Sequence, residues 1–278
     1  MIFFMDCDTK YPIMLIHGTG FRDGKYINYW GRIPAELKKR GAVIFYGHQD
    51  SWGSIEHNAE VLKTNLRKFL SETNYEKVNI IAHSKGGLEA RYMISSLGMA
   101  ENVASLTTIA TPHHGSETLD LLWKLSKPLF KFVAIFANLF YRILGDAKPD
   151  FFTTCNQFTT IHMKSFNERN PDAPNIYYQS YAGIMKNPFS CIIMFLPNFF
   201  VSLIEGENDG LVTPKSAEWT NFKGIIRGTT YRGISHPDLR DIRRINFAKN
   251  SIKNSQTGIS DIRTFYVTIV AELKNLGL

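Results

Sequence analysis

The stretch Val78-Asn-Ile-Ile-Ala-His-Ser-Lys-Gly-Gly-Leu88 decides how this sequence is expected to fold. Its first five residues are mostly apolar and suit one short buried strand. The two glycines that follow Ser84 and Lys85 allow an abrupt turn, and the residues from 88 to 97 then have a helical pattern. A strand that turns sharply into a helix presents a serine hydroxyl above the sheet. The alternative is an ordinary serine N-cap at the start of a helix.

Apolar runs alternate with helical patterns on both sides of this stretch. Such alternation predicts an α/β fold, with a mostly parallel central sheet flanked by helices and functional loops at the carboxyl ends of the strands. No repeat, low-complexity tract or linker interrupts the 278 residues, so we expect a single domain over 1–278. The expected strands are 13–16, 42–46, 78–82 and 103–109, and the expected helices are 30–40, 54–71, 88–97 and 260–276.

A reactive serine needs a histidine to take its proton, and that histidine needs a carboxylate to orient it. When the serine lies in such a turn, the acid and then the histidine follow it along the chain. Asp209 comes after an apolar run and lies in a tight turn, and His236 follows it. We therefore predict Ser84 as nucleophile, Asp209 as acid and His236 as base. The alternatives are Glu207 as the acid, and pocket-lining positions for His113 and His114.

Backbone amides are expected to complete this site, because they stabilise the negative oxygen that forms during acyl transfer. The Lys85 amide lies at the start of the helix after Ser84, where the helix dipole favours negative charge. The Thr19 amide lies in a glycine-rich loop after the first expected strand, although a simple glycine turn is the alternative there. His17 and His83 flank these two turns, and we expect them to support the turns and border the substrate.

Five short segments together resemble the bacterial true lipases, secreted triacylglycerol hydrolases of the α/β-hydrolase fold. The resemblance implies that fold, a serine mechanism with the same triad, and the same two oxyanion amides. Ala82 departs from the G-x-S-x-G pattern because it replaces the first glycine, a change of one methyl group. The matching segments, in the order of the family, are Pro12–Gly18, Ala82–Gly87, Ala110–Ser116, Asn208–Val212 and Ser235-His236.

The resemblance also bears on metals. Some of these lipases hold a structural calcium through a carboxylate at the position of Asp238. The glutamine that follows in those members is absent here, and the nearby Arg240 offers Asp238 an ion pair instead. We expect no required cofactor and no metal ligand. The cysteines, which lack metal-ligand spacing, are Cys7, Cys155 and Cys191.

The region 116–200 is expected to contain a helical lid-like insertion. Its stretch 129–144 is too apolar for a solvated surface helix, and in the resembled lipases a lid of this character covers an acyl pocket. From this lid, Phe136 and Phe140 are expected to contact the substrate. The alternative is packed core or a surface between subunits. The opposite wall is assigned to Phe195, Leu196, Phe199 and Phe200.

The binding partners and the cellular location of the protein are less constrained by its sequence. A net charge of +7 favours an anionic partner or surface, but the scattered Lys and Arg do not indicate nucleic-acid binding. Charges or proline interrupt the apolar stretches 128–145 and 188–204, so we expect no transmembrane segment. Residues 1–10 lack the apolar region of a signal peptide, and both secretion, as the resemblance implies, and a cytoplasmic location stay open.

The expected function is serine-dependent hydrolysis of carboxylic esters through an acyl-enzyme, by a triacylglycerol lipase acting at a lipid–water interface. The same triad would serve a carboxylesterase, a phospholipase, a polyester depolymerase or an acyltransferase. A non-catalytic binding protein on a hydrolase fold is the alternative from another class. The natural ester and the oligomeric state do not follow from the sequence.

Overall fold

The computed structural model describes residues 5–23, 28–228, 232–243 and 261–278. Within these residues, one sheet of six strands has the order β2-β1-β3-β4-β5-β6, and each neighbouring pair is parallel. The predicted α/β class and parallel sheet are therefore confirmed. The strands are β1 (Ile13–Ile16), β2 (Ile44–Tyr46), β3 (Val78–His83), β4 (Val103–Ile109), β5 (Tyr177–Gly183) and β6 (Phe222–Ile226).

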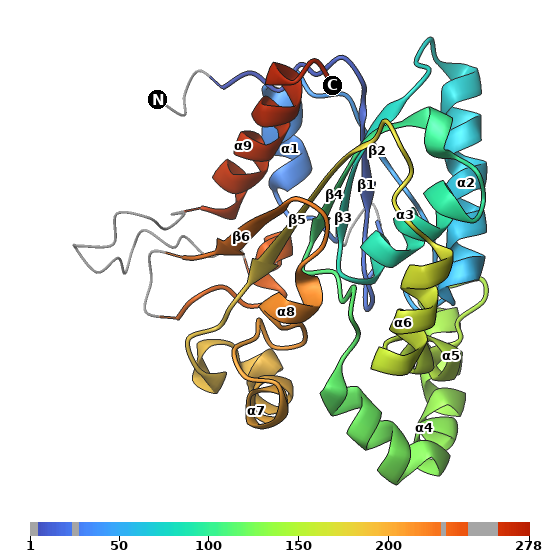
Figure 1. The fold of residues 1–278 in the computed structure, drawn as a ribbon, viewed down its shortest axis with the longest axis vertical. Coiled ribbons are helices and arrows are strands. Elements are labelled where there is room, and N and C mark those ends of the chain that lie inside the picture. The colour runs from blue at the N-terminus through green and yellow to red at the C-terminus, as the bar shows by residue number, and fades with distance from the viewer. Residues whose placement is uncertain (1–4, 24–27, 229–231, 244–260) are drawn as a thin grey trace.

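Helices cover both faces of the sheet (Figure 1). α1 (Ile33–Lys39) and α9 (Ile262–Asn275) pack on one face, and α2 (Ile55–Glu72) and α3 (Lys85–Ser95) pack on the other. Further helices lie in the segments between β4 and β5 and between β5 and β6. These are α4 (Glu117–Ile143), α5 (Phe151–Gln157), α6 (Thr160–Arg169), α7 (Phe195–Ile204) and α8 (Pro214–Ala217).

Alternate residues of the central strands enter two separate cores. In β1, Ile13 and Leu15 pack with the side chains of α1 and α9, whereas Met14 and Ile16 pack with those of α2 and α3. All residues of β1, β3 and β4 are buried. Strands that are covered on both faces need apolar residues on both, which is why they are continuous apolar runs in the sequence.

Local signals set the ends of the helices. The Ser54 side chain accepts a hydrogen bond from the His57 amide at the start of α2. At the start of α9, the Asp261 side chain accepts one from the Arg263 amide. α3 begins three residues before the predicted start, because the chain enters the helix directly after Ser84. Ser260, at the start of the predicted C-terminal helix, lies outside the described residues.

α4 and α7 lie at the end of the molecule away from α1 and α9 (Figure 1). α4 is interrupted at Ser126, whose φ of −134° and ψ of 21° are not helical, two residues before Pro128. A proline inside a helix removes one backbone hydrogen bond and clashes with the preceding turn, which accounts for the kink. Among the described residues, no helix has the length and apolar character needed to cross a membrane.

Candidate active site

Ser84 occupies the tight turn between β3 and α3. Its φ of 55° and ψ of −131° lie outside the regions that residues with a side chain favour. Two contacts hold this backbone in place: the Ser84 amide donates to the Ile109 carbonyl at 2.9 Å, and the Thr111 hydroxyl donates to the Ser84 carbonyl at 2.8 Å. Backbone strain of this kind persists only where the surroundings enforce it, and it is common at functional sites.

The turn packs so closely that it requires glycines. A Cβ atom on Gly18 would lie 2.7 Å from the Ser84 Cβ, and one on Gly86 would lie 2.5 Å from the His17 carbonyl oxygen. Both distances are shorter than any normal contact. Ala82, in contrast, lies in the core beneath α2 and α3, where its methyl group fills space. The turn therefore tolerates the alanine that replaces the first glycine of the motif.

Asp209 and His236 form a hydrogen-bonded pair beside this turn. The His236 Nδ1 lies 2.7 Å from Asp209 Oδ2, and the His236 amide donates to the Asp209 carbonyl, also at 2.7 Å. The second carboxylate oxygen of Asp209 accepts from the amides of Leu211 and Val212 at 3.0 and 2.9 Å. Asp209 is fully buried, and its four contacts fix the orientation of the imidazole ring.

The His236 ring reaches the serine turn from the side of His83. The two ring centroids are 4.5 Å apart, and His83 immediately precedes Ser84. His83 Nδ1 lies 2.7 Å from the Tyr29 hydroxyl. Burial, together with the nearby charges of His236 and Arg240, lowers the pKa of His83 well below its usual value, so this ring stays neutral.

His17 and His83 do not contact the pocket as predicted. Both side chains are fully buried, and neither lines the cavity above Ser84. The ring nitrogens of His17 lie 2.7 and 3.0 Å from the carbonyl oxygens of Gly18 and Gln49. These two histidines therefore support the turns from beneath, and their predicted place beside the substrate is corrected.

A buried ion pair connects the serine turn to the loop that carries Thr19. The Lys85 Nζ lies 2.7 Å from Glu89 Oε1, and both side chains are completely buried. Glu89 also accepts from Asn58 at 2.7 Å and from Gln49 at 3.1 Å, while the same Gln49 amide donates to the His17 carbonyl at 2.9 Å. Glu89 is not among the residues predicted from the sequence, although a Lys and a Glu four residues apart on one helix are a recognisable signal.

Glu89→Gln is expected to lower kcat by about 10- to 100-fold, with a smaller change in KM. The substitution keeps the shape of the side chain but removes the charge that pairs with Lys85 and accepts from Gln49. The Ser84 turn and the Thr19 loop would then shift slightly, and small displacements of reacting groups lower the rate strongly. Steady-state kinetics on p-nitrophenyl butyrate, with thermal melting in parallel, would measure this. Glu60→Gln, at an exposed position of α2, is the matched control. A Glu89 variant that melts earlier but keeps its kcat would contradict the positioning role.

The pocket above Ser84 has a volume of about 410 Å³ and no charged side chain in its lining. Its walls come from the Thr19 loop, the segment after β4, the first turns of α4, and α7. An uncharged, mainly apolar cavity of this size suits a hydrocarbon chain. The lining residues are Thr19, Trp52, Ser84, Pro112, Ser116, Thr118, Leu119, Leu122, Cys155, Phe158, Leu196, Pro197, Phe200, Val201, Leu211 and Val212.

Two predicted pocket residues of α4 lie elsewhere. Phe136 and Phe140 are 60% and 55% exposed and do not line this cavity. α4 contributes Leu119 and Leu122 from its first turns instead, before the kink at Ser126. On the opposite wall, Leu196 and Phe200 line the pocket as predicted, but Phe195 and Phe199 do not.

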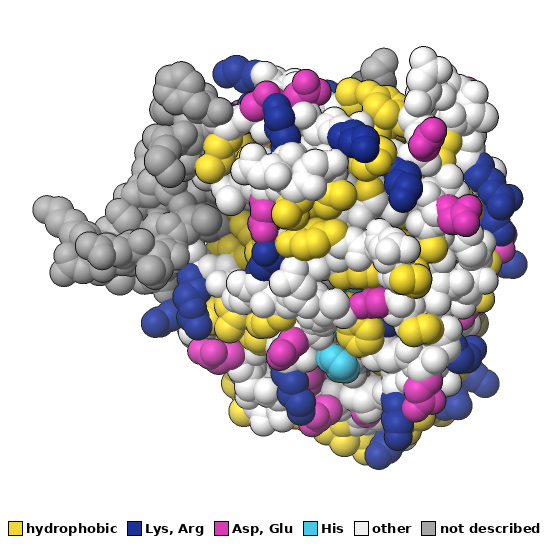
Figure 2. Space-filling model, turned by 45° about the horizontal axis from the view of Figure 1, so that its top comes forward, with side chains coloured by type: hydrophobic (Ala, Val, Ile, Leu, Met, Phe, Trp, Pro, Cys, Tyr) yellow, Lys and Arg dark blue, Asp and Glu magenta, His cyan; other side chains and the backbone are white. Residues whose placement is uncertain are grey.

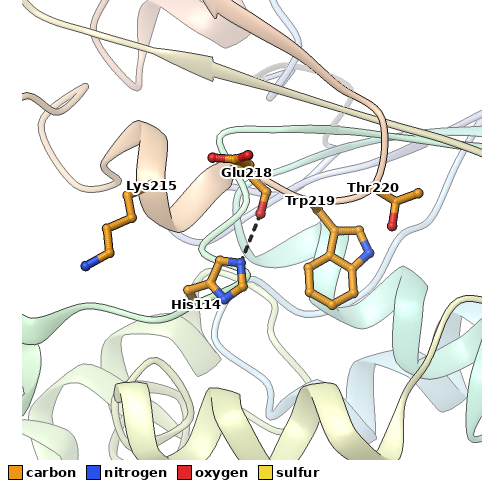
Figure 3. Close-up of a pocket in the computed structure, with 5 residues that line it drawn as sticks. All are labelled: His114, Lys215, Glu218, Trp219 and Thr220. Atoms are coloured by element: carbon orange, nitrogen blue, oxygen red, sulfur yellow. Dashed lines mark hydrogen bonds between the residues drawn. The ribbon is translucent and has the colours of Figure 1, made fainter.

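His113 and His114 also lie apart from the pocket above Ser84. His113 is fully buried, with Nε2 3.0 Å from the Thr108 hydroxyl. His114 lines a separate open hollow, in which its ring lies 3.1 Å from the Glu218 carbonyl oxygen (Figure 3). The alternative that placed these two histidines in the pocket above Ser84 is therefore not supported by its lining. The hollow is lined by His114, Lys215, Glu218, Trp219 and Thr220.

The buried neutral His113 is expected to make folding stability depend on pH. Burial, and then the charges of Arg91 and His114, lower its pKa well below 6.5. The unfolded chain therefore binds a proton below pH 6.5 that the folded chain resists, so stability is constant above this pH and falls below it. Urea unfolding at pH values between 7.5 and 5.5 should show a decrease of up to about 1.4 kcal/mol per pH unit from this group. His113→Gln should remove this part of the decrease in unfolding free energy with falling pH. If the unfolding free energies of the two proteins changed with pH in parallel, the role of His113 would be contradicted.

Asp238 forms the predicted ion pair, but with a different arginine. Its Oδ1 accepts from Arg243 Nε at 2.7 Å, and its Oδ2 accepts from the Ser235 amide at 3.0 Å. Arg240 instead lies over the Tyr29 ring, 4.3 Å from its centroid. The described residues around Asp238 therefore form a salt bridge. In the same described ranges, no cluster of three or more His, Cys, Asp or Glu residues could hold a metal ion.

A parallel sheet with a strained serine at a strand–helix turn, next to a buried Asp–His pair, defines the α/β-hydrolase class. Residues 12–228 match the family described as palmitoyl protein thioesterase. The chain is 30% identical over 276 residues to triacylglycerol lipase 2 of Saccharomyces cerevisiae, a match that covers 92% of this chain and 77% of that protein. The chain therefore belongs to the palmitoyl protein thioesterase family of α/β-hydrolases, is related to the triacylglycerol lipases, and is a hydrolase.

Other relatives agree with this assignment. A triacylglycerol lipase of Pseudarthrobacter phenanthrenivorans is 30% identical over 59% of this chain and 55% of its own length, so the chain spans about half of that relative. The crystal structure of the Staphylococcus hyicus lipase has a TM-score of 0.64 at 17% identity, covering 97% of this chain and 98% of that one. Lipase 1 of Pelosinus fermentans has a TM-score of 0.67 at 15% identity, covering 97% and 100%. The predicted α/β-hydrolase fold is confirmed.

Proposed function

We propose that this chain hydrolyses carboxylic esters of fatty acids through an acyl-enzyme on Ser84. The observation that carries the proposal is the Asp209–His236 pair, held at 2.7 Å beside a strained serine at the base of an uncharged pocket. Nucleophile, base and acid are then Ser84, His236 and Asp209. Glu207 is exposed and makes no contact with His236, which favours Asp209 as the acid.

In the first half-reaction, the Ser84 hydroxyl oxygen attacks the ester carbonyl carbon. Its proton passes to His236 Nε2, while Asp209 holds the other ring nitrogen in the protonated form and stabilises the imidazolium. The amides of Thr19 and Lys85 donate to the oxyanion. Within the described chain, neither amide donates a hydrogen bond to a protein acceptor, so both are available to a substrate. Losing one such donor typically costs about 100- to 1000-fold in kcat.

The first half-reaction ends when His236 gives its proton to the leaving alcohol, as the tetrahedral intermediate collapses to the acyl-enzyme. The second half-reaction releases the acid. A water molecule then loses a proton to His236 and attacks the acyl carbon, and the proton returns to the Ser84 oxygen as the ester bond to the enzyme breaks. No cofactor takes part in either step.

The acyl pocket favours a long-chain substrate. Leu119, Leu122, Leu196 and Phe200 present hydrocarbon on two sides of the cavity. The region 116–200 acts in this proposal as a lid-like insertion within a single domain. α4 begins at the pocket, and Glu205 at the end of α7 accepts from the Ser116 hydroxyl at 2.6 Å, so the two walls are joined.

Labelling with a fluorophosphonate probe tests the serine mechanism, and hydrolysis of p-nitrophenyl esters of increasing length tests the substrate class. We expect a single adduct on Ser84 and higher kcat/KM for long than for short acyl chains. Emulsified triglyceride, phospholipid and S-palmitoyl thioester substrates, compared directly, separate a lipase from a phospholipase or a thioesterase. Absence of labelling in folded protein would support a non-catalytic binding protein, and a flat length profile would support a carboxylesterase.

A further inference from the structure

The exposed hydrophobic side chains of this protein are concentrated in one place. In the described residues, all large hydrophobic side chains that are exposed belong to segments 121–144 and 189–204, except Phe21, Val43, Ile161, Leu211 and Leu276. We call the exposed hydrophobic side chains of these two segments the apolar rim. They include Leu125, Phe132, Ile135, Phe136, Leu139, Phe140 and Ile143 from the first segment, and Phe189, Ile192, Leu196, Phe200 and Leu203 from the second.

The rim is not an ordinary surface. In α4, which is described throughout, only Thr118 and Ala134 of its 27 residues are buried. Phe132, Phe136 and Phe140 are each exposed by more than half. An apolar patch of this extent on a soluble protein indicates a surface that something else covers. Because α4 and α7 contact one another at the pocket, the rim also frames the opening above Ser84.

All charged residues of the rim segments have the same sign. Segment 121–144 contains Lys124, Lys127, Lys131 and Arg142 and no acidic residue, and 189–204 has no charge at all. The four cations are exposed, and in the part of the chain that the structure describes none is paired with a carboxylate. The opposite end of the molecule differs, because Figure 2 shows Lys and Arg mixed with Asp and Glu there.

We infer that the apolar rim binds the surface of an anionic phospholipid bilayer. Helices that combine an exposed apolar face with Lys and Arg, and that are too charged to span a membrane, lie in the interface with cations at the headgroups. A second copy of this chain is a poorer partner, since two rims in contact would bring like charges together without an anion between them. The inference rests on the proposed function in one respect: binding would place the pocket opening against the lipid from which acyl chains enter.

The inference is tested by vesicle sedimentation with the full chain carrying Ser84→Ala, so that no lipid is hydrolysed. Binding to vesicles of equal parts phosphatidylcholine and phosphatidylglycerol is compared with binding to phosphatidylcholine alone. We expect at least about tenfold tighter binding to the anionic vesicles at about 0.1 M salt. The preference should fall sharply at about 1 M salt, where the screening length shortens to about 3 Å.

Charge-matched variants assign this effect to the rim. The triple variant Lys124→Gln, Lys127→Gln, Lys131→Gln should lose on the order of 100-fold in binding to anionic vesicles. The control Lys38→Gln, Lys39→Gln, Arg67→Gln removes the same charge from exposed positions of α1 and α2 and should bind nearly as the parent does. Circular dichroism establishes that each variant is folded.

Three outcomes would overturn the inference. They are equal binding to the two vesicle types, equal losses in the two triple variants, and sedimentation of a stable dimer that excludes vesicles from the rim. Ester hydrolysis is not measured in this experiment. A failure here is therefore distinct from a failure of the serine mechanism, which labelling of Ser84 tests on the protein alone.

Discussion

Ser84→Ala is expected to reduce kcat for p-nitrophenyl butyrate by on the order of a million-fold, with the fold intact. The hydroxyl is the only group of this residue that the proposed reaction uses, and without it the Asp209–His236 pair has no nucleophile to activate. Loss of the nucleophile in a serine hydrolase costs about this factor, and the remaining rate comes from binding and the oxyanion amides. Alanine keeps the Cβ of Ser84 that lies close to Gly18, so the packing of the turn should be unchanged. Steady-state kinetics, with circular dichroism as the check on folding, measures the effect.

Ser71→Ala is the matched control, because it removes the same hydroxyl from an exposed position of α2. It should keep the parental kcat. Activity of the Ser84 variant within a factor of ten of the parent would show that another residue is the nucleophile. Activity that falls equally in both variants would point to a preparation effect instead.

Much of this site follows from the sequence because its signals are local. The turn at Ser84 is encoded by one apolar strand and two glycines in a row, and the structure requires Gly86 because its α-carbon lies against the His17 carbonyl. The chain order of acid and histidine likewise restricts the choice to few residues. The central strands β1, β3 and β4 were recognisable because burial on both faces demands continuous apolar runs.

The elements that escaped prediction have mixed patterns with physical causes. β5 contains the buried polar residues Gln179 and Ser180. The Gln179 amide donates a hydrogen bond to the Thr107 hydroxyl at 2.8 Å, and the Ser180 hydroxyl donates one to the Trp219 carbonyl at 3.0 Å. β6 is an edge strand whose Gly224 has a φ of 109°. Partners far away in the sequence decide both cases, so no local pattern reveals these strands.

The positions of side chains around the pocket were harder to predict than the identity of the triad. The apolar run before Asp209 is the helix α7. The acid reaches the site because the Met185 amide, just beyond β5, donates to the Asn208 carbonyl at 2.8 Å. The kink at Ser126 interrupts α4, and the residues of this helix that line the pocket come before it. Amphipathic patterns give the face of a helix but not its direction in space, which explains the misplaced Phe136 and Phe140.

Asp209→Asn is expected to lower kcat by about 10,000-fold while leaving the fold intact. The amide keeps the size of the carboxylate, and one oxygen can still accept from the Leu211 and Val212 amides as in the parent. However, its NH₂ group then faces His236 Nδ1, which forces the proton onto Nε2, the nitrogen that must accept the proton of Ser84. This tautomer cannot act as the base, and the same change in other triads has an effect of about this size.

The neighbouring Glu207→Gln provides the control for Asp209→Asn, since Glu207 was the alternative acid and is exposed in the structure. Kinetics on p-nitrophenyl butyrate and the rate of fluorophosphonate labelling should both fall in the Asp209 variant and stay unchanged in the Glu207 variant. Because the reagent reacts with activated serine only, the labelling rate reports on the base rather than on substrate binding. The reverse pattern, a large loss with Glu207→Gln and a small one with Asp209→Asn, would assign the acid to Glu207 and would require the 206–209 turn to rearrange before the chemical step.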